Sequence, residues 1–214
     1  MIASFYISLK VLALDIPLLL LLGILMGWVL AKKDFPGRTL LSLVVLLPVV
    51  LPPSVMGLYL LAFLGHTPFL KELHIPFTFT AAAIGGLLPS LPIMIQSCRT
   101  GFAGVPASLE DTARTLGDSE WRIFRRITLP LARRHLFAGL ALASARALGD
   151  FGVTLMVAGN MAGRTQTLPL YIYSQVERLH FSTAYLASIL LVAAGTASLF
   201  FVRRIEEGRH ELSA

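Results

Sequence analysis

Five stretches of about 20 mostly apolar residues dominate this chain, and each has the length that a helix needs to cross a bilayer. Hydrophobic residues make up 56% of the 214 positions and charged residues only 14%, with a mean hydropathy of +0.75. Soluble domains carry about 25% charged residues. The sequence therefore predicts an all-α integral membrane protein with five transmembrane helices. The expected spans are Ile7–Leu30, Leu40–Leu64, Phe79–Cys98, Leu136–Ala158 and Thr183–Val202.

Basic residues predict how these spans are oriented. Thirteen of the 18 Lys and Arg residues lie between the first and second spans, between the third and fourth, or after the fifth. Loops of this kind stay in the cytoplasm, so we expect the N-terminus outside and the C-terminus inside. The same bias accounts for the net charge of +6 without a nucleic-acid partner. We expect a single transmembrane domain, residues 1–214, in the inner (plasma) membrane, with its longest cytoplasmic loop at residues 99–133.

The second and third spans each contain more than one proline, and these should kink or break the helices, because each proline removes a backbone donor and crowds the preceding turn. Pro48, Pro52 and Pro53 lie in the second span, and Pro89 and Pro92 lie in the third. Freed carbonyl groups are tolerated where a helix packs against protein or lines a cavity. Two interpretations stay open: these helices line a translocation path, or the prolines only shape their packing.

The longest polar loop begins with the pattern of a short amphipathic helix. Ser108 is a suitable N-cap for this helix, and Leu109, Ala113 and Leu116 share one of its faces. Gly117 is placed to end the helix in a left-handed conformation.

A second short helix is expected to follow, running through Trp121, Phe124 and Ile127 until Pro130. Helices this short cannot bury their apolar residues alone. The apolar stripe of the first helix therefore needs a partner, which is the protein's own spans, the lipid surface or another protein.

The loop resembles the cytoplasmic loop of permease subunits of bacterial ABC importers, which has the form E-A-A-x3-G-x9-I-x-L-P. Asp111 stands at the position of the family's Glu and is followed by Thr112 and Ala113. The neighbouring Glu110 can share the acidic role. The other positions match in residue and spacing and are Gly117, Ile127, Leu129 and Pro130.

Three further runs are similar to the molybdate, tungstate and sulfate branch of these permeases, and most of all to its molybdate members. The runs are LLPVVLPPSVMGLYLL, SARALGDFGVT and AGNMAGRTQTLPLYIYSQVE. The resemblance extends from Ser8 to Arg204. It implies the fold of a type I ABC importer permease and transport of a tetrahedral oxyanion, with molybdate expected and tungstate or sulfate as alternatives.

The resemblance also implies partners. Such permeases work as homodimers in membrane lipid, receive the anion from an extracytoplasmic binding protein and dock on a cytoplasmic ATPase dimer that binds ATP and Mg²⁺. The chain itself is then not an enzyme, and we expect it to bind no cofactor or metal. The flanking Arg122, Arg125 and Arg126 either meet lipid headgroups or contact the ATPase. The ATPase-coupling residues carried over from the family are Leu109, Glu110, Asp111, Ala113, Leu116, Gly117, Ile127, Leu129 and Pro130.

Arg146 and Asp150 lie inside the fourth span, four residues apart, so they can face each other on a helix. Charges inside a membrane usually face protein, a pore or one another. One interpretation places Arg146 on the anion's path, and the other makes the two a structural ion pair. The second is favoured, because an Arg paired with an Asp has little charge left for an anion. Asp15, near the outer end of the first span, is expected to be solvated or anchored to Lys10.

Residues 159–180 form the largest outer loop, in which Thr167–Val176 is expected to be a short helix with Leu168, Tyr171 and Ile172 on one side. An outer gate, a landing surface for the binding protein and anchoring at the membrane interface by Tyr171 and Tyr173 all fit this pattern.

Other function classes lack their signatures. The sequence has no G-x4-G-K-[ST] loop for ATP, no H-E-x-x-H or G-x-S-x-G motif, and five histidines without metal-ligand spacing. A membrane enzyme is therefore disfavoured. A secondary transporter or channel that runs on ion gradients is the second rival, and the absence of an inverted internal repeat argues against it. A bare membrane scaffold is the third rival, which uptake assays would exclude.

Overall fold

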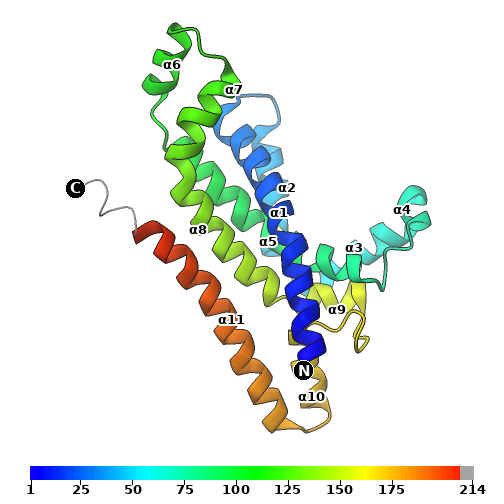
Figure 1. Ribbon diagram of the computed structural model, residues 1–214. Coiled ribbons are helices and arrows are strands. Elements are labelled where there is room, and N and C mark those ends of the chain that lie inside the picture. The colour runs from blue at the N-terminus through cyan, green and yellow to red at the C-terminus, as the bar shows by residue number, and fades with distance from the viewer. Residues whose placement is uncertain (208–214) are drawn as a thin grey trace.

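The computed structural model describes the backbone of residues 1–207 and the side chains of residues 1–197, 199 and 200. This part of the chain is helical and contains no strand. Three long helices lie side by side: α1 (Ile2–Lys32), α5 (Phe79–Ala103) and α8 (Leu129–Leu148). A fourth long helix, α11 (Phe181–Glu207), runs beside α8 at the edge of the bundle (Figure 1).

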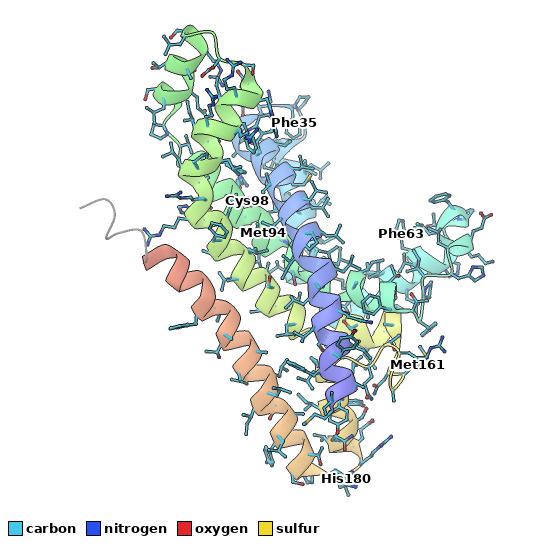
Figure 2. The ribbon with its side chains drawn as sticks, viewed as in Figure 1. Phe35, Phe63, Met94, Cys98, Met161 and His180 are labelled. Atoms are coloured by element: carbon cyan, nitrogen blue, oxygen red, sulfur yellow. The ribbon has the colours of Figure 1, made fainter. Side chains whose placement is uncertain are left out.

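Small residues bring α1 and α5 into close contact. Gly23 and Gly27 lie one turn apart on α1. A Cβ atom at Gly27 would overlap the Cβ of Cys98 and lie 3.0 Å from the backbone nitrogen of Arg99. Met94 and Cys98 lie in the middle of the bundle, between the ribbons of α1 and α8 (Figure 2). Such glycines let the backbones of two helices approach each other closely. In lipid this close packing matters, because the hydrophobic effect does not drive helices together there.

The second apolar segment forms two helices instead of one. α2 (Arg38–Val50) and α3 (Pro53–His66) meet at an angle of 117°. The expected break at Pro52 and Pro53 is confirmed, because both residues fall at the junction and Pro53 begins α3, where no amide hydrogen is needed. α3 and the short α4 (Pro68–Glu72) project sideways from the bundle (Figure 1). α5, in contrast, runs without a break through its two prolines.

The fourth segment is also bent. α8 ends at Leu148, and α9 (Gly152–Ala158) follows at an angle of 57°. A Cβ atom at Gly152 would lie 2.6 Å from the Cβ of Pro53, so α9 packs closely on the start of α3. The two breaks of the chain therefore lie against each other.

By length and composition, α1 and α5 can each span a membrane, and two further spans result if each bent pair counts as one. These counts refer to the described residues. The fifth expected span, Thr183–Val202, falls within α11, whose described apolar stretch is Phe181–Ala197. The basic residues predicted to follow this span have side chains outside the described part of the chain. α10 (Leu168–Glu177) precedes α11, and His180 lies at the corner between them (Figure 2).

Candidate functional site

Two short helices, α6 (Ala107–Thr115) and α7 (Glu120–Ile123), form one end of the molecule (Figure 1). The predicted stop at Gly117 is confirmed, because its φ of 88° is left-handed. The amides of Gly117 and Asp118 donate to the carbonyls of Arg114 and Ala113 at 3.0 and 3.1 Å, a Schellman ending. The predicted N-cap is wrong: α6 begins after Pro106, and Ser108 lies inside the helix.

The second helix does not end at Pro130, contrary to the sequence prediction. α7 continues into a π-helical turn, η1 (Phe124–Thr128), and then directly into α8. Pro130 falls in the first turn of α8. A π turn is a local widening of the helix that is often found at functional sites, and here it joins the loop to a long helix of the bundle.

Aromatic rings fix α7 and η1 against the bundle. The ring of Phe124 lies 6.1 Å from that of Trp28 on α1, 5.9 Å from that of Phe102 on α5 and 5.7 Å from that of Trp121. Ile127 and Leu129 pack against the same core. These two motif residues therefore have a packing role that needs no partner protein.

The two neighbouring acids of α6 face different surroundings. Glu110 is buried, and its carboxylate accepts hydrogen bonds from Nζ of Lys32 at 2.8 Å and from the hydroxyl of Thr128 at 2.6 Å. The side chain of Asp111 is 65% exposed and pairs with Arg114 at 2.6 Å. Glu110 therefore faces the bundle and Asp111 faces outward.

The residues of the predicted apolar stripe on α6 differ in their exposure to solvent. Ala113 is buried, whereas Leu109 is 47% and Leu116 82% exposed. Trp121 on α7 is 69% exposed. These exposed apolar side chains make the loop a candidate surface for contact with lipid or another protein.

Arg114 joins α6 to α7 on the outer face of the loop. Its guanidinium binds Asp111 and, at 2.6 Å, Glu120. The hydrogen bond from Arg114 lowers the pKa of Glu120, and the bond to Glu120 is the main cause of the raised pKa of Arg114. Both groups are exposed, so water and salt screen the pair and it adds little stability.

Arg146 and Asp150 form an ion pair at the bend between α8 and α9. A guanidinium nitrogen of Arg146 lies 3.1 Å from Oδ1 of Asp150. The other carboxylate oxygen accepts hydrogen bonds from the amide and the hydroxyl of Thr154, at 2.9 and 2.8 Å. Asp150 is thus buried with both oxygens bound, and one of them accepts from an amide in the first turn of α9.

The prediction that Asp15 is solvated or anchored to Lys10 is wrong. The residue is fully buried, and neither carboxylate oxygen has a hydrogen-bond partner among the described residues. Gly86 of α5 provides the space, since a Cβ atom there would lie 3.0 Å from Oδ2 of Asp15. An isolated acid within a long apolar helix is the sequence feature that could have predicted this burial.

Replacing the two buried acids by asparagine should have opposite effects. We expect Asp15→Asn to raise the free energy of unfolding by about 1–3 kcal/mol, because it removes a buried carboxylate without partners. Asp150→Asn should lower it by a similar amount, because it breaks a satisfied ion pair. Melting temperatures in one detergent would measure both. A loss of stability in both variants would mean that Asp15 has a partner from another chain.

A buried polar network holds the opposite end of the molecule. Ser4 of α1 donates to the side chain of Gln166, which donates to Asn160 at 2.8 Å, and Asn160 donates to Ser174 of α10 at 2.7 Å. The hydroxyl oxygen of Ser8 accepts from the amide of Leu168. The helix predicted for this loop is confirmed within one residue at each end. Its inward face, however, is made by Leu168, Pro169, Leu170, Ser174 and Gln175.

A bundle of long apolar helices, with a short polar loop anchored at one end, is the architecture of an integral membrane protein. The chain belongs to the family of binding-protein-dependent transport system inner membrane components, whose model matches residues 20–210. The resemblance found in the sequence is thereby confirmed, and the chain is a transport component and not an enzyme. Among the described residues, no group of three or more His, Cys, Asp or Glu side chains is arranged to hold a metal.

Several known proteins are similar to the chain. The molybdenum transport system permease protein ModB of Escherichia coli K12 is 38% identical over 178 residues, which cover 80% of this chain and 78% of ModB. The sulfate transport system permease protein CysW of Synechocystis sp. PCC 6803 is 31% identical over 206 residues, covering 92% and 75%. A bacterial alginate ABC transporter, solved in complex with an alginate pentasaccharide-bound periplasmic protein, has a TM-score of 0.75 over 96% of this chain and 78% of that chain. At 15% identity, this last likeness shows the fold alone.

Proposed function

We propose that the chain is the permease subunit of an ATP-driven ABC importer for a tetrahedral oxyanion, with molybdate as its substrate. Its identity to ModB supports the choice of anion. In this proposal two copies form a homodimer in the plasma membrane, each as one domain with five spans and an external N-terminus. An extracytoplasmic binding protein delivers the anion, a separate ATPase dimer holds ATP and Mg²⁺, membrane lipid surrounds the spans, and this chain binds no cofactor.

The exposed face of α6 is the observation that carries the proposed mechanism. Leu109 on α6 and Leu116 at its C-terminal end are apolar yet exposed, and Asp111 of α6 is exposed as well. In the proposed complex these residues enter a groove on the ATPase. ATP binding draws the ATPase subunits together, and α6 passes the movement to the membrane helices, which is coupling between two distinct sites.

Reconstitution tests this proposal. The complex would be tagged on this chain, purified from its native membranes in mild detergent and placed in liposomes with ATP inside. We expect a stoichiometric ATPase subunit in the complex and uptake of radiolabelled molybdate that requires both ATP and the binding protein. Uptake driven by an ion gradient without ATP would contradict the proposal in favour of a secondary transporter.

Sulfate is the second candidate substrate, because CysW aligns with 92% of this chain. Competition in the same liposomes separates the candidates. Unlabelled molybdate should suppress uptake at lower concentration than sulfate, with tungstate as a further tetrahedral competitor. Stronger suppression by sulfate would reassign the substrate.

We assign Arg146 and Asp150 a structural role at the α8–α9 bend. For Pro52 and Pro53 both interpretations stay open: they line a translocation path, or they only shape helix packing. Arg146→Ala is expected to lower transport through poorer assembly. The change leaves the buried Asp150 carboxylate without its cation, at a cost of about 2 kcal/mol, so less complex should elute from gel filtration. Arg146→Lys, which keeps the charge, should assemble better. Normal assembly of Arg146→Ala with lost transport would instead place Arg146 on the anion's path.

A further inference from the structure

Few side chains hold α6 against the bundle. The helix is described throughout, and its buried residues are Glu110 and Ala113. Ala113 contributes a single methyl group, and the exposed Arg114 binds Glu120 of α7 and not a long helix. The directional contacts of α6 with the bundle thus depend on Glu110. The placement of α6 relative to the long helices is therefore set largely by what Glu110 binds.

Glu110 binds two different helices, one through each carboxylate oxygen. Lys32, the last residue of α1, donates to Oε2, and Thr128, the last residue of η1, donates to Oε1. Lys32 also donates to the carbonyl of Val105, just before α6, at 3.4 Å. The Lys32 and Glu110 side chains are only 18% and 7% exposed. Salt screens a pair this shielded much less than it screens a surface pair.

A cavity beside the contacts of Glu110 makes these contacts important for the position of α6. A cavity of about 270 Å³ lies between α6, α7 and the end of α1, and Lys32, Glu110 and Thr128 form part of its wall together with Trp28 and Phe124. Apolar packing does not fill this gap. If the contacts of Glu110 were lost, α6 could tilt into the cavity without moving α1 or α8.

We propose that Glu110 is a positioning residue that transmits the movement of α6 to α1 through Lys32 and to α8 through Thr128. This inference rests on the proposed function as an ATP-driven importer. Asp111, which occupies the acidic position of the family pattern, faces outward and has no such contact with the bundle. The neighbouring acids therefore have different roles. Asp111 lies on the surface that contacts the ATPase, and Glu110 connects that surface to the membrane helices.

Glu110→Gln tests the proposal because it keeps the size of the side chain and removes the charge that binds Lys32. The complete complex, with its ATPase and binding protein, would be reconstituted and both molybdate uptake and ATP hydrolysis measured. We expect uptake to fall about tenfold, within the usual range of allosteric coupling. ATP hydrolysis should stay within about twofold of wild type, so the ATP consumed per anion rises. A purely structural defect would lower both rates together.

Two variants control this experiment. Glu72→Gln makes the same chemical change at an exposed acid of α4, outside the coupling loop, and should leave the ATP consumed per anion unchanged. Thr128→Val keeps the shape of the side chain, removes one of the two hydrogen bonds to Glu110 and should raise the ratio by a smaller factor. A wild-type ratio in Glu110→Gln would overturn the proposal. If that variant does not assemble, a wild-type ratio in Thr128→Val would overturn it instead. Failure of the wild-type complex to couple ATP to uptake would count against the proposed function itself.

Discussion

A complex that carries Leu116→Asp is expected to lose its ATPase subunit and, with it, oxyanion uptake. Leu116 is 82% exposed in the single chain and is followed directly by the left-handed turn at Gly117. Docking would bury this side chain, and a carboxylate there would lose its hydration without gaining a partner. The loss of a central apolar contact alone costs about 2 kcal/mol or more, which is at least roughly thirtyfold in affinity. Binding of purified ATPase to the permease in nanodiscs measures the effect.

The matched control places the same charge on the adjacent residue. Thr115 is exposed and lies about 100° away around the helix from Leu116, so Thr115→Asp should bind the ATPase within about twofold of wild type. Neither variant should change the melting temperature, because both side chains are exposed. Full ATPase binding by Leu116→Asp, combined with weaker binding of the loop to anionic vesicles, would assign this face to lipid headgroups.

Local backbone chemistry accounts for what the sequence predicted well. The end of α6 follows from Gly117, because glycine tolerates a positive φ at little cost. The break between α2 and α3 follows from Pro52 and Pro53, which cannot donate backbone hydrogen bonds. The bounds of α10 follow from a short amphipathic pattern. Each of these features depends on residues a few positions apart, which a single sequence displays directly.

Features that depend on distant residues were not predictable in the same way. Asp15 is buried because Gly86 of another helix leaves room for its carboxylate. Glu110 differs from Asp111 because Lys32 and Thr128 reach only one of the two acids. Continuation of the loop helix through Pro130 depends on a π turn whose aromatic contacts come from three parts of the chain. Nothing near these residues in the sequence signals such contacts.

The contact between α1 and α5 leads to the second large expected effect, which concerns folding and not coupling. Gly27→Ala should lower the free energy of unfolding by about 1–3 kcal/mol through overpacking, or roughly 2–12 °C in melting temperature for a chain of this size. The added Cβ atom would lie 3.0 Å from the backbone nitrogen of Arg99 and 3.1 Å from the carbonyl oxygen of Ile95. Backbone atoms cannot rotate away as a side chain can, so the two helices must separate.

Gly65→Ala is the matched control, because Gly65 is also helical but a Cβ atom there meets nothing within 4 Å. Its stability should stay equal or rise by about 0.5–1 kcal/mol, since alanine is the better helix former. The difference between the two variants isolates the close approach of α1 and α5 from the general effect of removing a glycine. Equal melting temperatures would mean that these helices lie further apart in the assembled transporter. A lower value for Gly27→Ala alone would show that the close approach of α1 and α5 stabilises the fold, and Lys32 ends α1 five residues beyond this contact.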